Sequence, residues 1–259
     1  MTGTLEPISR DELTASLRRL GIADGDVVMV HASLRAMGPV EDGAAGVVRA
    51  LDAAVGPTGT LMMTLGAREG GEPFDCHLTP ADPDIGVLAE VFRQAPGTVV
   101  SDHPEGRFGA RGRLADALTS EVPWDDYYGP GSPLERLVEA QGRVLRLGAD
   151  RDTVTLIHYA EYLADVPNKR RVVRQPRVRG ARGPQIRVVH CLDDSDGIVD
   201  YPGEDYFAQI LRAYLATGRA AEGTVGGAQS ELIDARDIVE FATAWMEANL
   251  EGGRNRGPG

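Results

Sequence analysis

The chain has 259 residues, of which 42% are hydrophobic and 25% are charged, as is ordinary for a globular protein. Its formal net charge of −12 argues against nucleic acid as the main partner, because phosphate binding requires a basic surface. No apolar run approaches the ~20 residues that cross a bilayer, and no signal peptide precedes the first helix, so we expect a cytoplasmic protein without membrane contact. Cys76 and Cys191 are too few for a disulfide framework. We expect one α/β domain over residues 1–250 and a disordered tail over 251–259.

The first part of the sequence alternates between helix and strand patterns. A capping box at Ser9–Glu12 begins an amphipathic helix that ends at Gly21. Short apolar runs at Val27–Val30 and Thr60–Thr64 predict buried strands, and Ala44–Val55 predicts a helix between them. This order indicates a parallel sheet with a right-handed crossover.

Two segments of this part are candidates for a site. The first predicted strand delivers the turn His31–Arg35 at its C-terminal end, the usual place for a site in an open α/β sheet. The long loop from Gly66 to Gly86 is expected to line or cover that site. Its carboxylates either receive ammonium groups or are simply solvated, and they are Glu69, Glu72, Asp75, Asp82 and Asp84.

The middle of the chain continues this alternation. Val87–Arg93 predicts a helix, and Thr98–Ser101 predicts a short strand that leads into His103. Ser132 followed by Pro133 is a strong helix start, with the serine as N-cap.

The last third contains a basic segment between predicted helices. Residues 169–187 hold eight basic residues and no acidic one. Arg171–Arg174 and Gln185–Leu192 are expected to pair as a hairpin. Their charges either protect exposed strand edges or form a phosphate-binding rim. Helices are expected over Glu204–Ala216 and Ala235–Leu250.

The stretch from Val144 to Leu163 holds the most informative histidine. An apolar strand over Val144–Gly148 is followed by a helix over Val154–Leu163, with Asp152 or Thr153 as N-cap. Thr155, His158 and Glu161 are spaced three apart and share one face of that helix. From this segment alone, His158 is either a packed histidine or a catalytic one.

Motifs of several large enzyme classes are missing from the sequence, including the phosphate-binding loop, the dinucleotide-binding glycine pattern and the zinc-protease motif. The five histidines nevertheless leave a metal site arithmetically possible. A metal-dependent hydrolase built on His31, His103 and His158 is therefore a rival hypothesis.

A series of short sequence blocks runs from the first strand to near the C-terminus. The blocks are Val30-His31-Ala-Ser33-Leu34, Gly56-Pro57-x-Gly59-Thr60-Leu61, Pro73-Phe74-Asp75, His103-Pro104-x-x-x-Phe108-x-Ala110-x-Gly112, Gly131-Ser132-Pro133-Leu134, Leu147-Gly148 with Thr155-x-x-His158-x-x-Glu161, Gly203-Glu204-Asp205-Tyr206-Phe207 and Gly223-x-Val225-Gly226-x-Ala228. In this order and at these separations, the chain resembles the aminoglycoside 3-N-acetyltransferases. It departs from the family pattern at Ala32 and Arg107, where serine is usual, and at Gly109, where alanine is usual.

The resemblance implies acetyl transfer from acetyl-CoA to the 3-amino group of a 2-deoxystreptamine ring, by direct attack in a ternary complex. It also implies a mixed β-sheet core flanked by helices, the antibiotic acetyltransferase fold, which is distinct from the GCN5-related fold. Carried over to this sequence, His158 is the general base and Glu204 its carboxylate partner. Glu161, which is the obvious partner by helical spacing, is the alternative to Glu204.

The resemblance also implies the remaining site residues. Thr155 is expected to donate a hydrogen bond to the thioester oxygen. Acetyl-CoA is expected to lie against His31, Ala32, Ser33, Leu34, Arg35, Ser101, His103 and Phe108. An aminoglycoside is expected to contact Glu72, Asp75, Asp152, Glu161 and Asp205.

The chemistry of the residues supports a histidine base independently. An ammonium group cannot attack a thioester, so a base must first remove a proton, and imidazole has a reference pKa of ~6.5. A carboxylate on the second ring nitrogen fixes the tautomer and stabilises the imidazolium. Without the resemblance, Glu204 is equally well explained as a first-turn helix residue. The alternatives left open are acetylation of another amine, binding of aminoglycosides without turnover, and the metal-dependent hydrolase; the chain is expected to act as a monomer or homodimer.

Overall fold

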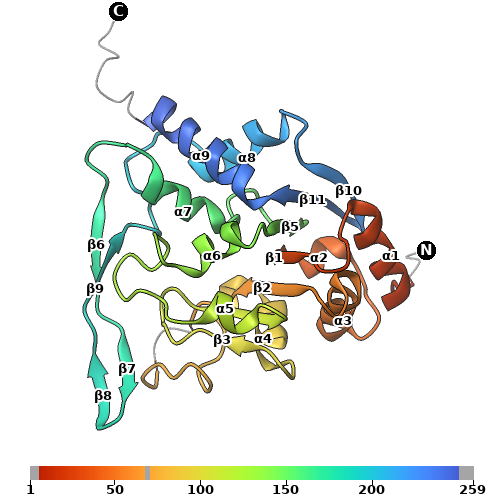
Figure 1. The fold of residues 1–259 in the computed structure, drawn as a ribbon, viewed down its shortest axis with the longest axis horizontal. Coiled ribbons are helices and arrows are strands. Elements are labelled where there is room, and N and C mark those ends of the chain that lie inside the picture. Colours follow the sequence, from red (N-terminus) through yellow and green to blue (C-terminus); the bar gives the residue numbers. More distant parts are fainter. Residues whose placement is uncertain (1–5, 68–70, 251–259) are drawn as a thin grey trace, which may run out of the picture.

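A seven-stranded sheet forms the centre of the protein, in the order β10-β11-β5-β1-β2-β4-β3 (Figure 1). The computed structural model describes residues 6–67 and 71–250, so the predicted tail over 251–259 lies outside the described residues. The strands of this sheet are β1 (Val27–Ala32), β2 (Thr60–Thr64), β3 (Val99–Val100), β4 (Phe108–Gly112), β5 (Arg143–Leu147), β10 (Ala221–Val225) and β11 (Ala228–Asp234).

Only the middle of this sheet is parallel. Strand β1 runs parallel to β2 and to β5, whereas β4 and β11 pair antiparallel with the outer sides of β2 and β5. The sheet is therefore mixed, as the family resemblance implied, and not wholly parallel, as the first elements indicated. Strands β4, β10 and β11 were not predicted from the sequence. In β10 most side chains are exposed, which removes the apolar run that identifies a buried strand.

Helices cover both faces of the sheet (Figure 1). Strand side chains alternate between the two faces, so Val28 and Val30 pack in one core cluster while Val27 and Met29 pack in the other. The first face carries α1 (Arg10–Leu20), α3 (Gly43–Val55) and α4 (Val87–Gln94). The second carries α5 (Ala115–Thr119), α6 (Pro133–Glu139), α7 (Leu156–Leu163), α8 (Tyr206–Leu215) and α9 (Ala235–Leu250).

Helix starts show where the sequence signals were sufficient. The capping box of α1 between Ser9 and Glu12 is present, and Ser132 caps α6, as predicted. Helix α7 begins two residues later than predicted and has Thr155 as its N-cap. Helix α8 begins at Tyr206 with Asp205 as its N-cap, so Glu204 precedes the helix instead of opening it.

Two small antiparallel sheets project from the body at one edge (Figure 1). Strand β6 (Arg171–Arg174) pairs with β9 (Val189–Leu192), which confirms the predicted pairing of these segments. Between them, β7 (Arg177–Gly180) and β8 (Gly183–Ile186) form a second hairpin where a loop was predicted.

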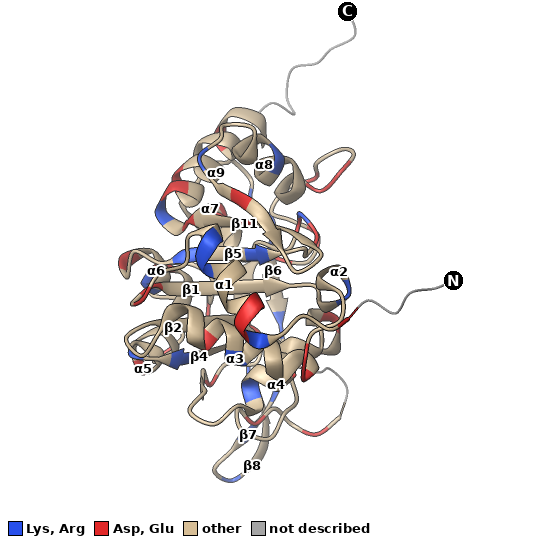
Figure 2. Cartoon of the chain, turned by 90° about the vertical axis from the view of Figure 1, so that its right-hand side faces the viewer, with Lys and Arg blue, Asp and Glu red and all other residues tan. Residues whose placement is uncertain are grey.

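Several basic residues of this segment pair with carboxylates outside it. Arg171 pairs with Asp126, and Arg174 pairs with Asp194. Arg179 lies 3.5 Å from a carboxylate oxygen of Asp75. In Figure 2, where the cartoon is coloured by charge, basic and acidic positions are likewise interspersed along the chain. These charges tie the small sheets to the body, a role that neither alternative from the sequence included.

The loop between β2 and α4 folds around the buried side chain of Arg107. The guanidinium group is fully buried and lies over the ring of Phe74, 5.2 Å from its centroid. It donates hydrogen bonds to four backbone carbonyls of this one loop, those of Gly66, Cys76, Thr79 and Pro80. The loop ends in a short 3₁₀ turn, η1 (Pro83–Ile85), that leads into α4.

In the described part of the chain, no helix has the length and apolar character needed to cross a membrane.

Candidate active site

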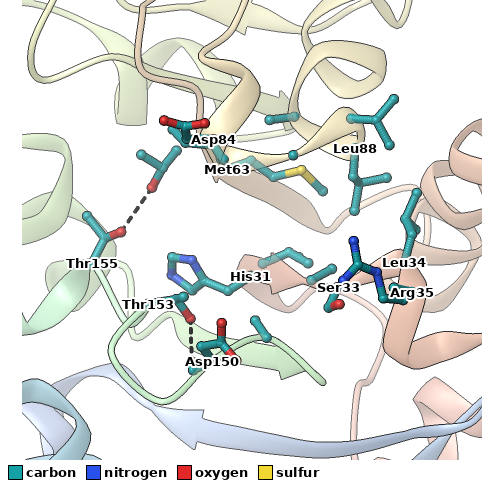
Figure 3. A pocket seen from close by; sticks show the side chains of 18 residues that line it. His31, Ser33, Leu34, Arg35, Met63, Asp84, Leu88, Asp150, Thr153 and Thr155 are labelled. Atoms are coloured by element: carbon teal, nitrogen blue, oxygen red, sulfur yellow. Dashed lines mark hydrogen bonds between the residues drawn. The ribbon is translucent and has the colours of Figure 1, made fainter. Parts of the chain in front are cut away.

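A pocket of about 710 Å³ lies at the carboxyl ends of the parallel strands β1 and β2 (Figure 3). Its walls come from four segments: residues 30–35, residues 63–64, residues 84–89 and part of the loop between 149 and 155. A ligand site at this edge of the sheet is the position expected for an open α/β fold.

The turn after β1 forms one wall of this pocket, as expected from the sequence. His31, Ala32, Ser33, Leu34 and Arg35 all line it. Ser33 is also a helix cap, because its side-chain oxygen accepts a hydrogen bond of 3.3 Å from the backbone N–H of residue 36, at the start of the short helix α2 (Leu34–Met37). Burial and the positive charge on residue 146 lower the pKa of His31 to about 4, so its imidazole is neutral at neutral pH.

The other residues expected to bind acetyl-CoA are buried elsewhere. The Ser101 hydroxyl donates to the carbonyl of Gly106 and accepts from the N–H of Phe108, which is fully buried in the sheet. His103 is fully buried; its Nδ1 accepts from the Gly106 N–H, and its Nε2 lies 3.2 Å from the Trp124 carbonyl. The structure does not place Ser101, His103 and Phe108 on the wall of this pocket, because the first two side chains bond within their own turn and Phe108 packs in the core.

His158 lies on the first turn of α7, three residues after Thr155, which lines the pocket. Its Nδ1 atom is 2.7 Å from Oε2 of Glu161, and the Glu161 side chain is only 1% exposed. The second Glu161 oxygen accepts a hydrogen bond from the hydroxyl of Tyr206. An Nδ1–H that donates to Glu161 leaves the lone pair on Nε2, to which no described residue forms a hydrogen bond.

The electrostatics of this pair raise the pKa of His158. Burial alone lowers the pKa of His158, but the adjacent Glu161 carboxylate, assisted by Asp194 and Asp205, outweighs it and raises the pKa above its ordinary value. Because the paired carboxylate stabilises the imidazolium, His158 can accept a proton without creating an isolated buried charge.

Glu204 is not the partner of His158. It forms an ion pair of 2.5 Å with Arg212 and is about half exposed, in the turn before α8. The predicted His158–Glu204 pair is therefore wrong, and the alternative, Glu161, is correct. Glu161 was also expected to contact the aminoglycoside. The structure gives that contact no support, because the buried carboxylate oxygens of Glu161 are already bonded to His158 and Tyr206.

The remaining acidic candidates do not gather at the pocket. Asp205 caps α8 by accepting a hydrogen bond of 2.6 Å from the backbone N–H of residue 207. Asp152 is exposed in the turn before α7, and Glu72 is exposed in the 66–86 loop. Asp75 lines a separate cavity of about 230 Å³. Glu69 lies outside the described residues.

Three residues that the site predictions omitted do line the pocket. Asp84 was noted only as one of several loop carboxylates. Asp150 follows β5, at the same edge of the sheet as the end of β1. Thr64 is the last residue of β2, and its hydroxyl lies 3.2 Å from the hydroxyl of Thr155 (Figure 3). Their positions at the ends of predicted strands could have identified Thr64 and Asp150, because parallel strands present their carboxyl ends at one edge of the sheet.

The geometry does not support the metal-dependent hydrolase. Among residues 6–67 and 71–250, no group of three or more His, Cys, Asp or Glu side chains is arranged to hold a metal ion. His103 is moreover engaged through both ring nitrogens within its own loop region.

The protein combines a pocket of about 710 Å³ at the carboxyl edge of an α/β sheet with a carboxylate-paired histidine one helical turn from a residue that lines the pocket. This is the arrangement of an enzyme that binds a small molecule and has a histidine available for proton transfer. Residues 29–247 match the model of one protein family, described as aminoglycoside 3-N-acetyltransferase. The chain belongs to the aminoglycoside 3-N-acetyltransferase family.

Individual relatives agree with this assignment. The chain is 43% identical to aminoglycoside N(3)-acetyltransferase VII of Streptomyces paromomycinus, over 98% of this chain and 96% of the relative. It superposes on AAC-IIIb in binary complex with CoASH with a TM-score of 0.91 and 39% identity, covering 94% of this chain and 97% of that one. It superposes on AAC-VIa bound to sisomicin with a TM-score of 0.89 and 39% identity, covering 94% and 98%.

These comparisons confirm the resemblance that the sequence blocks indicated. They confirm the fold class, and they confirm that the chain is an enzyme, an aminoglycoside 3-N-acetyltransferase that uses acetyl-CoA as its co-substrate. The metal-dependent hydrolase is thereby excluded as the activity of the family fold.

Proposed function

We propose that His158 is the general base for direct transfer of the acetyl group from acetyl-CoA to the 3-amino group of a 2-deoxystreptamine ring, within a ternary complex. The observation that carries the proposal is the 2.7 Å contact between Nδ1 of His158 and Glu161, which leaves Nε2 without a partner among the described residues. A base must present an unprotonated atom to the proton that it removes, and Nε2 is that atom.

The proposed reaction needs one proton acceptor and one leaving group. Nε2 of His158 removes a proton from the acceptor ammonium, and the Glu161 carboxylate stabilises the imidazolium that forms. The amine nitrogen attacks the thioester carbonyl carbon, and the C–S bond then breaks. The nitrogen loses its second proton as the amide forms. One of the two protons passes from His158 to the departing CoA thiolate and the other is released to solvent, so the enzyme returns to its starting state and the products are an amide, a thiol and one proton.

The pocket beside Thr155 is suited to the acyl donor. Its volume of about 710 Å³ falls within the range of ~300–1,000 Å³ that is usual for cofactor sites. Arg35 at its exposed rim would meet the phosphates of CoA. The Thr155 hydroxyl would donate to the thioester oxygen as negative charge develops there. Because Thr155 and His158 are one helical turn apart, the acyl group and the base would meet at the start of α7.

The charge around His158 supports a cationic acceptor. Asp194 and Asp205 both raise the pKa of His158, so each acts on the space around the imidazole. The chain as a whole carries a net charge of −12. An acidic protein attracts a polycationic antibiotic and repels nucleic acid, which is consistent with small molecules as the substrates. One chain supplies the pocket, the base and its partner, so the reaction requires no second copy, although a homodimer would also work.

A coupled thiol assay tests the proposal. Purified protein, acetyl-CoA and each member of a panel of 2-deoxystreptamine antibiotics are mixed, and free CoA thiol is followed with time. We expect antibiotic-dependent thiol release and one new amide at the 3-amino group, located by NMR of the product. Thiol release only with other amines would show that the acceptor is wrong, and saturable antibiotic binding without thiol release would replace catalysis by sequestration.

A further inference from the structure

The imidazole of His158 contacts two aromatic rings. The ring of Tyr128 is nearly parallel to it, with an interplanar angle of 10° and a centroid separation of 5.0 Å. The ring of Phe207 lies 4.6 Å away, tilted by 57°. Tyr128 comes from the segment before α6, whereas Phe207 comes from the first turn of α8. Two segments that are far apart in the sequence therefore contact the same histidine.

The Tyr128 ring is held by the core and not by His158 itself. It makes edge-to-face contacts with Tyr127, at 4.7 Å between centroids, and with Phe108, at 6.0 Å. The Tyr127 hydroxyl in turn donates a hydrogen bond of 2.5 Å to Asp194. Tyr128 and Phe207 are 8% and 6% exposed. A ring fixed in this way restricts the neighbouring imidazole, because close-packed aromatic groups have few alternative positions.

The contacts around His158 leave one edge of its ring available. The rings of Tyr128 and Phe207 contact the imidazole ring, and Glu161 is hydrogen-bonded to Nδ1. The Glu161 hydrogen bond fixes which nitrogen is protonated, but one hydrogen bond alone permits the ring plane to rock about it. The parallel Tyr128 ring opposes that rocking, so the direction of the Nε2 lone pair is set by the stack and the hydrogen bond together.

We propose that Tyr128 is a positioning residue whose stacked ring holds the imidazole of His158 in the plane that directs Nε2 toward the acceptor amine. This inference rests on the proposed role of His158 as the base. It assigns the effect to the aromatic ring of Tyr128, not to its hydroxyl. A misplacement of about 1 Å in a reacting group can cost on the order of 10²-fold in rate, so a modest loss of alignment is measurable.

The experiment compares Tyr128→Phe with Tyr128→Leu in the full-length enzyme. Tyr128→Phe keeps the ring and is expected to retain most of kcat. Tyr128→Leu is expected to lower kcat by about tenfold to a hundredfold. The loss is expected to persist on the alkaline plateau, where His158 is neutral, and the KM for acetyl-CoA is expected to remain near the wild-type value. A purely structural role would not lower kcat while leaving the KM for acetyl-CoA unchanged.

A matched control separates alignment from stability. Tyr214→Leu makes the same substitution at another buried tyrosine, on α8, whose ring contacts Phe241 instead of His158. It is expected to lower the free energy of unfolding but to leave kcat of the folded enzyme unchanged. Both leucine variants are assayed at a temperature where circular dichroism shows them folded.

Histidine-selective ¹⁵N NMR tests the stack without turnover. In the wild type, His158 is expected to show a single Nδ1–H tautomer, and Tyr128→Leu is expected to broaden or average its nitrogen signals. If His158→Ala keeps wild-type kcat, the proposed base is wrong, whereas the nitrogen signals still report whether Tyr128 orders the ring. A folded Tyr128→Leu enzyme with wild-type kcat and unchanged His158 signals would overturn the inference, as would a Phe variant that loses as much kcat as the Leu variant.

Discussion

Nδ1 of His158 and Oε2 of Glu161 lie 2.7 Å apart on the same turn of α7. Residues three apart face the same side of a helix, so this pair forms as soon as α7 forms. The hydroxyl of Tyr206, which is distant in the sequence, then bonds the other carboxylate oxygen and fixes the glutamate in place. A locally encoded pair is thus held in its working geometry by a tertiary contact.

Glu161→Gln is expected to lower kcat by on the order of 10²–10⁴, the range for loss of general-base function. An amide can donate its N–H to Nδ1, which would place the proton of His158 on Nε2, the wrong nitrogen for a base. The control is Glu204→Gln, which removes an exposed ion pair with Arg212 and is expected to leave kcat unchanged. Steady-state kinetics check both, and equal losses in the two variants would restore Glu204 as the partner.

His158→Ala is expected to lower kcat by about 10²–10⁴-fold while the dissociation constants of acetyl-CoA and the antibiotic change little. The imidazole is proposed to act in proton transfer and not in holding either substrate. Stopped-flow kinetics and calorimetric titration measure the two effects separately. An unchanged kcat would remove His158 from the mechanism.

The acid limb of the profile of kcat/KM against pH is expected above ~6.5, the reference pKa of histidine. The Glu161 carboxylate helps to raise the pKa of His158, and the base works only when neutral, so activity falls as the pH is lowered through that raised value. The folding stability linked to this pKa shift changes in the opposite direction with pH from the activity. It is fully present below the unfolded-state pKa and is lost as the pH rises through the folded-state pKa. An acid limb below the reference value would contradict this prediction.

Arg35→Ala is expected to raise the KM for acetyl-CoA by roughly tenfold or more, the equivalent of losing one charge-assisted hydrogen bond of about 1.5–3 kcal/mol. The KM for the aminoglycoside is expected to stay the same. Acetylpantetheine, which lacks the nucleotide and its phosphates, provides the comparison. If Arg35→Ala weakens this short donor equally, then Arg35 does not act on the phosphates.

Arg107→Ala is expected to destabilise the protein by several kcal/mol, because each buried carbonyl left without a donor costs about 1–3 kcal/mol. The loop over residues 66–86 is expected to become sensitive to limited proteolysis, since four of its carbonyls bond to this one guanidinium. Arg113→Ala is the control at an exposed arginine just after β4 and is expected to change the free energy of unfolding by less than ~0.5 kcal/mol. Urea unfolding of the two variants provides the comparison, and equal stabilities would contradict the prediction.

Local signals were reliable wherever one stretch of sequence decides the outcome. The capping box at Ser9, the N-cap at Ser132 and the apolar strand at Thr60–Thr64 were predicted and are present. These features depend on hydrogen bonds and side-chain patterns within a few residues. Strand β10 could not be found in this way, because it is stabilised by pairing with β11 at an exposed edge of the sheet and carries little apolar pattern of its own.

The same distinction applies to the site residues, some of which follow from local sequence while others depend on tertiary packing. The sequence placed His31–Arg35 after a buried strand and His158 on a helix face, and the pocket and the Glu161 contact lie at those positions. It did not place His103 correctly, because whether a histidine faces a pocket or its own turn depends on how the surrounding chain packs.

By itself, the sequence determined the family, the sheet with its flanking helices and the turn of α7 that bears the histidine, because these follow from ordered blocks and local periodicity. The tertiary structure alone decided that Glu204 pairs with Arg212 and not with His158, and that Tyr128 and Phe207 contact the His158 ring. The physical reason is that a long-range contact depends on where separate elements pack. Glu204 lies in a turn that the N-cap of α8 directs toward Arg212, and no local pattern in the sequence reports that direction.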